Sequence, residues 1–208
     1  TDLCSIVYTS GSTAAPKGVE MTHEHYCTTA LNLPAYMPKL LHERKNSVLL
    51  FLPQAHSFAR AINYICVASE LHIYIAQGIK TLIADLQVAK PSVMIVVPRV
   101  LEKVYNAASQ KAGAGIQGNF AQSVKHFVKW SKDEQAGRGH SFIERMRHSF
   151  YMATGGQIHS FRSRTEPQWL ACGGAPLNVD LAHFFNGMND ITFIQGYGMT
   201  ETAAPMLV

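Results

Sequence analysis

The sequence has no apolar run long enough to cross a membrane, and its longest such runs are 48–52 and 93–97. A transmembrane helix needs about 20 consecutive apolar residues, so these short runs indicate buried strands instead. The first residues also lack a basic segment followed by an apolar one, the pattern of a secretory signal peptide. We therefore expect a cytoplasmic protein, and 47% hydrophobic residues in a chain of 208 fit one good-sized core.

Cysteine is scarce, and the few cysteines are far apart in the sequence. They are Cys4, Cys27, Cys66 and Cys172. No C-x-x-C pair and no Cys/His spacing typical of a metal site is present. We interpret these residues as small buried hydrophobic side chains in a protein of a reducing compartment.

The net charge is a modest +4. Much of the positive charge comes from arginines in one region, Arg138, Arg145, Arg147, Arg162 and Arg164. A solvated helix face is the simplest interpretation, and attraction to anionic lipid, CoA or a carrier protein is the alternative. Peripheral contact with the inner face of a membrane is therefore a second expectation. No aromatic-interleaved basic repeat or helix-turn-helix pattern is present, which disfavours nucleic acid as a partner.

Short apolar runs alternate with helical patterns along most of the chain. Strands are expected at 3–8, 48–52, 73–76, 92–97, 169–172 and 192–195, and helices at 22–33, 61–71, 81–89 and 178–186. This alternation predicts an α/β fold with a parallel-sheet core covered by helices. Glycine-rich breaks at 112–115 and 135–139 precede two long helical patterns, 119–132 and 141–161, which predict a helical insertion.

A polar loop, YTSGSTAAPKG at 8–18, follows the first expected strand, which the apolar residues of 3–7 indicate to be buried. It combines hydroxyl side chains, glycines that relax backbone restrictions and the mobile ammonium group of Lys17. Such a loop can surround a polyphosphate, although a Ser/Thr/Gly cluster is often only a turn. It is not a Walker A loop, because Pro16 precedes Lys17 and Gly18 follows it.

Two further segments near the C-terminal end complete a pattern. They are GGAPL at 173–177 and QGYGMTE at 195–201. With the loop at 8–18, and in this order, they resemble the adenylate-forming superfamily of acyl-CoA synthetases, luciferases and peptide-synthetase adenylation domains. Segments LPQAHSF at 52–58 and VPRVLEKVY at 97–105 are similar to the long-chain fatty acyl-CoA synthetase (AMP-forming) branch. The resemblance spans essentially the whole chain and implies a partial N-terminal domain of the adenylate-forming fold.

The resemblance implies an AMP-forming ligase that uses ATP, Mg²⁺ and CoA. A fatty acid carboxylate would attack the α-phosphorus of ATP, pyrophosphate would leave, and the CoA thiol would then displace AMP from the acyl-adenylate. Such phosphoryl-type chemistry depends on alignment and charge neutralisation more than on covalent help from the protein.

The resemblance also implies roles for individual residues. The implied nucleotide-binding residues are Thr9, Ser10, Gly11, Ser12, Thr13, Lys17, Gly173, Gly174, Ala175, Pro176, Gly196, Tyr197, Gly198, Met199 and Thr200. The loop at 8–18 would bind the β- and γ-phosphates, Tyr197 would stack on adenine and Thr200 would reach the α-phosphate. Glu201 would hold Mg²⁺, which prefers oxygen ligands. The residues implied in catalysis are Lys17, His56, Thr200 and Glu201.

His56 is placed by the resemblance near the substrate carboxylate or the acyl tunnel, where an imidazole can donate a hydrogen bond. A capping or purely structural histidine is the alternative. Ala14 stands where the family most often has glycine, and a methyl group there would cost about 1 kcal/mol if the position needs positive φ.

We expect 1–208 to be a fragment of the AMP-binding domain, without the C-terminal domain and itself inactive. A fatty acyl-AMP ligase or another carboxylate-adenylating enzyme is an alternative function for the whole protein. A nucleotide-binding scaffold without catalysis is the alternative from another class.

Overall fold

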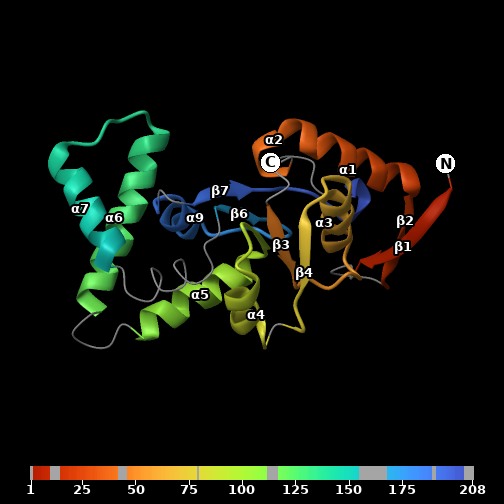
Figure 1. The fold of residues 1–208 in the computed structure, drawn as a ribbon, viewed down its shortest axis with the longest axis horizontal. Coiled ribbons are helices and arrows are strands. Elements are labelled where there is room, and N and C mark those ends of the chain that lie inside the picture. Colours follow the sequence, from red (N-terminus) through yellow and green to blue (C-terminus); the bar gives the residue numbers. More distant parts are fainter. Residues whose placement is uncertain are drawn as a thin grey trace.

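Figure 1 shows the computed structural model, which describes residues 2–9, 15–41, 46–78, 80–111, 117–154, 168–188 and 191–203. Strands are β1 (Leu3–Thr9), β2 (Lys17–Thr22), β3 (Ser47–Leu50), β4 (His72–Ile75), β5 (Val93–Val96), β6 (Trp169–Cys172) and β7 (Thr192–Gln195). Helices are α1 (His23–Tyr36), α2 (Pro38–Leu41), α3 (Ser57–Ala68), α4 (Leu82–Ala89), α5 (Pro98–Lys111), α6 (Gln117–Gln135), α7 (Phe142–Thr154) and α9 (Val179–Asn186), with a 3-10 helix, η1, at Thr200–Thr202.

The centre of the molecule is a five-stranded sheet with the order β4-β3-β5-β6-β7. Every neighbouring pair in it is parallel. The predicted α/β fold with a parallel sheet is therefore confirmed. The strands are nearly continuous apolar runs because helices cover both faces of the sheet.

Successive residues of a strand point to opposite faces of the sheet, so they pack in two different hydrophobic cores. Val48 and Val93 pack against α1, α2 and α3 on one face. Their neighbours Leu49 and Met94 pack against α4, α5 and α9 on the other face. Figure 1 shows α1 and α2 on one side of the strands and α4 and α5 on the other.

Side-chain caps start two of the helices. The Thr22 Oγ1 accepts a hydrogen bond from the His25 backbone N (3.4 Å), and the His25 Nδ1 accepts one from the Thr22 backbone N (3.1 Å). The Asn178 Oδ1 likewise accepts from the Leu181 backbone N at 3.1 Å and opens α9. Each cap satisfies backbone donors that would otherwise lack an intrahelical partner. The predicted helix start at Thr22 is confirmed.

The first strand is not buried, contrary to the sequence prediction. Among the described strands, β1 pairs only with the antiparallel strand β2, outside the parallel sheet, and Leu3 and Ile6 are 53% and 49% exposed. Val7 is the buried residue of β1, where it packs with Met21 of β2. A two-stranded ribbon can cover only one of its faces, so an apolar run within it stays half exposed.

Other expectations also need correction. Lys17 begins a strand instead of lying within the polar loop, and α5 was not among the helices predicted from the alternation of apolar runs and helical patterns. Cys66 and Cys172 are buried as expected, but Cys27 is exposed and Cys4 only half-buried. The helix expected at 141–161 is confirmed over Phe142–Thr154; Ser141 precedes it, and residues 155–161 lie outside the described ones.

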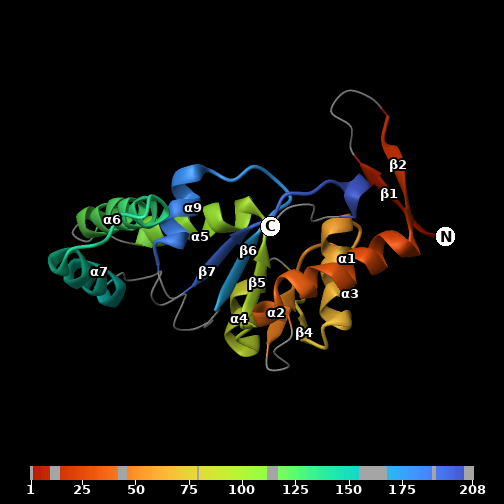
Figure 2. The same cartoon turned by 90° about the horizontal axis from the view of Figure 1, so that it is seen from above.

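The predicted helical insertion is a pair of helices, α6 and α7, at the opposite end of the molecule from β1 and β2 (Figures 1 and 2). α6 packs on α9, where Gly187 follows directly. A Cβ at Gly187 would stand 2.1 Å from the Phe127 backbone O, so only glycine permits this close approach.

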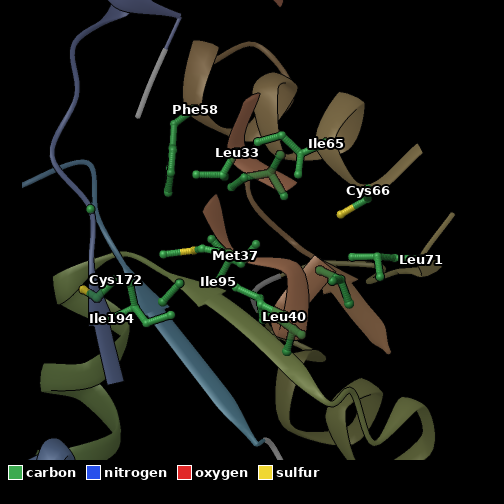
Figure 3. A pocket seen from close by; sticks show the side chains of 15 residues that line it. Leu33, Met37, Leu40, Phe58, Ile65, Cys66, Leu71, Ile95, Cys172 and Ile194 are labelled. Carbon is green, nitrogen blue, oxygen red and sulfur yellow. The ribbon is translucent and has the colours of Figure 1, made fainter. Parts of the chain in front are cut away.

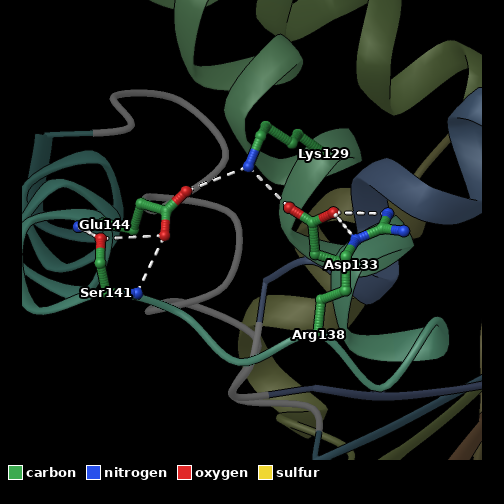
Figure 4. A network of polar contacts seen from close by, with 5 residues as sticks. All are labelled: Lys129, Asp133, Arg138, Ser141 and Glu144. Atoms are coloured by element: carbon green, nitrogen blue, oxygen red, sulfur yellow. Dashed lines mark hydrogen bonds and ion pairs between the residues drawn. The ribbon is translucent and has the colours of Figure 1, made fainter.

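An ion-pair network joins α6 to the start of α7 (Figure 4). The Lys129 Nζ lies 2.6 Å from the Asp133 Oδ2 and 3.0 Å from the Glu144 Oε1, and Arg138 also pairs with Asp133. The Ser141 backbone N and side chain donate hydrogen bonds to Glu144, each at 2.9 Å. These bonds, first that from the Ser141 backbone and then that from Lys129, lower the pKa of Glu144 to about 2.

Candidate nucleotide and acyl site

The carboxyl ends of the parallel strands meet at one edge of the sheet, where open α/β sheets bind ligands. Segment 51–56 follows β3, Val97 follows β5, the glycine pair 173–174 follows β6 and segment 196–199 follows β7. The predicted motifs that follow strands β3, β6 and β7 therefore converge at this edge.

A cavity of about 520 Å³ lies at this edge. Its lining is Leu52, Pro53, His56, Ser57, Phe58, Ala59, Val97, Gly174, Gly196, Tyr197, Gly198, Met199 and Thr200. The cavity thus brings together seven residues predicted as site residues, His56, Gly174, Gly196, Tyr197, Gly198, Met199 and Thr200. It is large enough for a nucleotide-sized ligand and carries both apolar and polar groups.

Glycines allow the strand ends to approach one another closely. Gly174 has φ +83°, a conformation that residues with a side chain rarely adopt. A Cβ at Gly173 would stand 3.0 Å from the Gly196 backbone O and 3.4 Å from the Phe58 ring. The Gly196 backbone N donates to the Cys172 backbone O at 2.8 Å, which continues the β6–β7 pairing into the site. Ala175 and Pro176 follow as exposed residues outside the cavity lining.

The last motif presents its side chains to solvent around the cavity. Tyr197 is 57% exposed, so its ring is accessible for stacking on a flat ligand. The Met199 backbone N donates to the Thr202 Oγ1 at 3.0 Å, which closes the turn of η1. Thr200 lines the cavity and Glu201, next in the chain, is exposed.

The first motif lies next to the last one, although neither Thr9 nor Lys17 lines the cavity. β2, which Lys17 begins, contacts η1, and Ala203 packs with Val7 and Met21 in one buried cluster. The Thr9 Oγ1 donates to the Lys17 backbone O at 3.4 Å, and Lys17 itself is exposed. The predicted phosphate-binding residues Ser10, Gly11, Ser12 and Thr13, with Ala14, lie outside the described residues.

His56 stands at the N-cap position of α3, but its side chain makes no capping hydrogen bond. It lines the cavity instead, together with Phe58. The capping alternative for this histidine is therefore wrong, and a contact with a ligand in the cavity stays a prediction.

A second, smaller cavity of about 70 Å³ lies between the sheet and helices α1 to α3 (Figure 3). Its lining is Leu33, Met37, Leu40, Val48, Phe58, Ile62, Ile65, Cys66, Leu71, Val93, Ile95, Ala171, Cys172, Ile194 and Gly196. Apart from the two thiols, no side chain of this lining carries a polar group. Burial raises the pKa of both Cys66 and Cys172 to about 12, so both stay neutral thiols at physiological pH.

Phe58 and Gly196 line both cavities, so the apolar cavity adjoins the larger one. Phe58 and Val97 belong to segments that the sequence analysis singled out, yet no role was predicted for either. A role in ligand binding could have been predicted for both, because each follows or lies near the carboxyl end of a strand, where open α/β sheets bind ligands.

Within the described residues, no group of three or more His, Cys, Asp or Glu side chains could hold a metal ion. A Mg²⁺ ion is commonly held by one or two carboxylates together with substrate phosphates and water. Glu201 is an exposed carboxylate beside the cavity-lining Thr200, so it fits a Mg²⁺ site that one carboxylate forms together with substrate phosphates and water.

Comparison with known proteins identifies the family to which this chain belongs. The sequence model of the AMP-binding enzyme family matches residues 1–208, and the chain therefore belongs to this family. It is 35% identical to the long-chain-fatty-acid–CoA ligase FadD15 of Mycobacterium bovis, with 100% of the chain covering 34% of that protein. It is 31% identical to long chain acyl-CoA synthetase 3 of Arabidopsis thaliana, again over 100% of the chain and 31% of the relative. The chain thus spans about a third of the length of these curated relatives.

Solved structures show the same fold at lower sequence identity. The o-succinylbenzoate coenzyme A synthetase of Bacillus subtilis in complex with AMP aligns with a TM-score of 0.60 at 14% identity, over 99% of this chain and 31% of that one. The N-terminal domain of FACL13 from Mycobacterium tuberculosis aligns with a TM-score of 0.56 at 16% identity, over 95% of this chain and 36% of that one. The fold is therefore that of the N-terminal domains of adenylate-forming enzymes.

Proposed function

We propose that the protein is an AMP-forming ligase that activates a long-chain fatty acid with ATP and transfers it to CoA. The observation that carries the proposal is the pair of adjoining cavities, one at the glycine-rich strand ends and one lined by apolar side chains. Two curated relatives are named as long-chain acyl-CoA ligases or synthetases, which supports this substrate class.

In the proposed arrangement, the larger cavity holds the nucleotide. Gly173 and Gly174 bring backbone close to the adenine base, with Ala175 and Pro176 bordering that segment, and the exposed Tyr197 ring stacks on the base. Thr200 contacts the α-phosphate. Thr9, Lys17 and the hydroxyl residues between them in the sequence contact the β- and γ-phosphates, and β2, which Lys17 begins, lies beside η1.

The apolar cavity holds part of the acyl chain, since it offers the alkyl group a dry surface. The acid's carboxylate then emerges between Phe58 and Gly196, which both cavities share, and close to His56. His56 donates a hydrogen bond to one carboxylate oxygen and so orients the other toward the α-phosphorus.

The reaction then follows from position and charge. The carboxylate oxygen forms a bond to the α-phosphorus while the bond to pyrophosphate breaks, and Lys17 offsets the charge of the leaving phosphates. Glu201 would hold Mg²⁺, which would supply further neutralisation of the phosphate charge. The CoA thiolate then bonds to the acyl carbon, and AMP leaves with the electron pair of the broken bond between the acyl carbon and the phosphate oxygen of the mixed anhydride.

The experiment is palmitate-dependent exchange of labelled pyrophosphate into ATP by the intact protein. Lys17→Ala is expected to slow the exchange because it removes the positive charge that offsets the charge of the leaving pyrophosphate. A loss of about 2–4 kcal/mol of transition-state stabilisation corresponds to roughly 30- to 900-fold. The matched control is Lys103→Ala on α5, an exposed lysine away from both cavities, which is expected to leave the rate unchanged.

The same assay separates the alternatives. Adenylate formation without thioester formation when CoA is added would identify an acyl-AMP ligase. The absence of pyrophosphate exchange with every carboxylic acid tested would identify a nucleotide-binding scaffold without catalysis. A rate in Lys17→Ala equal to that of the control would contradict the role given to this lysine.

A further inference from the structure

Helix α7 carries an apolar surface that faces solvent. Phe142, Ile143, Met146 and Phe150 are 77%, 69%, 60% and 60% exposed. At about 100° per residue, these four side chains fall within an arc of about 100° on one side of the helix. We call this surface the α7 stripe.

The opposite side of α7 is the one that holds the helix to α6. His148 is buried and its ring stacks on Trp130 with centroids 4.1 Å apart. The Tyr151 ring lies 5.1 Å from the ring of His126, and its hydroxyl donates to the Gln122 Oε1 at 3.4 Å. α7 is therefore docked on α6 through His148 and Tyr151, which lie outside the α7 stripe, and the Phe150 ring also contacts the neighbouring Tyr151 ring, with centroids 5.8 Å apart.

Charge is arranged around the α7 stripe in a definite way. On the helical wheel Arg147 lies about 40° beyond one edge of the stripe and Arg145 about 60° beyond the other, past Ser149, and both arginines are exposed. Glu144 is the acidic residue of α7, and it points toward α6, where it pairs with Lys129 (Figure 4). The solvent side of α7 is thus apolar along its middle and cationic along both edges.

We propose that the α7 stripe lies on the surface of a bilayer that contains anionic lipid. An apolar face bordered by arginines is the pattern of interfacial helices, because the apolar side chains enter the headgroup boundary while the guanidinium groups reach phosphates. α7 has 13 residues and is about 20 Å long, so it lies in the interface and does not span it. None of the helices in the described parts of the chain could cross a membrane.

The position of α7 suits this partner better than a second copy of the chain. α7 is at the outer end of the α6–α7 pair, so a flat surface can reach it without meeting the sheet and its covering helices (Figures 1 and 2). Two copies meeting through the α7 stripe would place arginines of one next to arginines of the other, whereas lipid phosphates neutralise them.

The test is co-sedimentation of the intact protein with vesicles of phosphatidylcholine alone or of phosphatidylcholine and phosphatidylglycerol in equal parts. We expect at least about tenfold tighter binding to the mixed vesicles, weakening as salt rises. The combined variant Phe142→Ser, Met146→Ser and Phe150→Ser is expected to lose about tenfold or more. The control combines Leu31→Ser on α1 with Val88→Ser on α4, which are 69% and 87% exposed, and is expected to bind like the wild type.

A second measurement does not depend on the folding of the serine variant. Phe142→Trp places a reporter in the α7 stripe, and brominated phosphatidylcholine in mixed vesicles should quench its emission well beyond the quenching of the wild type. Arg145→Gln with Arg147→Gln should reduce binding to the mixed vesicles and leave the weak binding to phosphatidylcholine nearly unchanged.

Five outcomes would overturn the proposal, four in binding, quenching and oligomeric state and a fifth in the tryptophan emission. The first four are no binding of the wild type to mixed vesicles, equal loss in the control, no added quenching at residue 142, and a dimer in solution that the serine variant abolishes without any vesicle binding. Emission of the tryptophan at 142 from a buried environment in the free protein would also overturn it, because another segment would then cover the α7 stripe. None of these readouts depends on catalysis, so a failure of the membrane proposal would leave the proposed function untouched, and the reverse also holds.

Discussion

In the proposed acyl-CoA ligase, substituting Ala171 by leucine should change which fatty acids are activated. Ala171 lies in β6 between Ile95 of β5 and Ile194 of β7 in the register of the sheet. All three residues line the apolar cavity, and alanine is the small one in the row. Its size leaves a depression between two isoleucines, and an isopropyl group added there would occupy part of a cavity of only about 70 Å³.

The magnitude follows from the apolar surface that a substrate would lose. Displacing about three methylene groups of the acyl chain, at about 0.8 kcal/mol each, costs about 2.4 kcal/mol. This corresponds to a decrease in kcat/KM of roughly 60-fold for an acid that fills the cavity. An acid too short to reach Ala171 should lose almost nothing, and ATP affinity should not change because Ala171 is absent from the larger cavity.

The assay is kcat/KM for a series of saturated acids from octanoate to palmitate, with ATP affinity measured in parallel. The control is Ala68→Leu, an exposed alanine at the end of α3, which should behave as wild type. Thermal unfolding shows whether each variant is folded. An equal loss for every acid, or no loss for any, would refute the assignment of this cavity to the acyl chain.

Further predictions concern packing, ionisation and the phosphate loop. Gly187→Ala should lower the free energy of unfolding by about 1–3 kcal/mol in urea titrations, since its Cβ would meet the Phe127 backbone O at 2.1 Å. The raised pKa values of Cys66 and Cys172 mean that the unfolded chain loses thiol protons first; between pH 9 and about 12 each thiol should therefore lower stability by about 1.4 kcal/mol per pH unit. Ala14→Gly should leave ATP affinity unchanged or raise it in calorimetric titrations with a non-hydrolysable analogue.

Each of these predictions has a control or a contrary outcome. Gly139→Ala should be nearly neutral, because a Cβ there would meet nothing within 4 Å. Alanine in place of Cys66 or Cys172 should reduce the loss of stability between pH 9 and about 12. Cys27→Ala, which removes an exposed thiol, should not change it. A clear loss of ATP affinity in Ala14→Gly would show that the loop requires alanine.

Much of the fold could be predicted from the sequence because it depends on local patterns. The apolar runs at Trp169–Cys172 and Thr192–Gln195 form strands with the predicted bounds, and Thr22 caps α1 as expected. Apolar runs, turn residues and capping side chains act over a few residues, so their signal is readable without knowing the fold.

The sequence was less informative where position is set by distant parts of the chain. The extent of α5 was not predicted from the helical patterns, although its apolar face packs into the main core through Leu101 and Ala108. The nucleotide motifs could be named from their order, but Phe58 and Val97 joined the site only when the ends of β3, β5, β6 and β7 came together.

By itself, the sequence determined the family, the α/β alternation and most of the residues that line the larger cavity, because these depend on residue type and local order. Only the tertiary structure decided which apolar residues are buried. Leu3 and Ile6 of β1 and the stripe on α7 have the composition of core residues, yet all are exposed. The physical reason is that burial requires a partner surface, and a residue's own neighbours in the chain do not specify whether one is present.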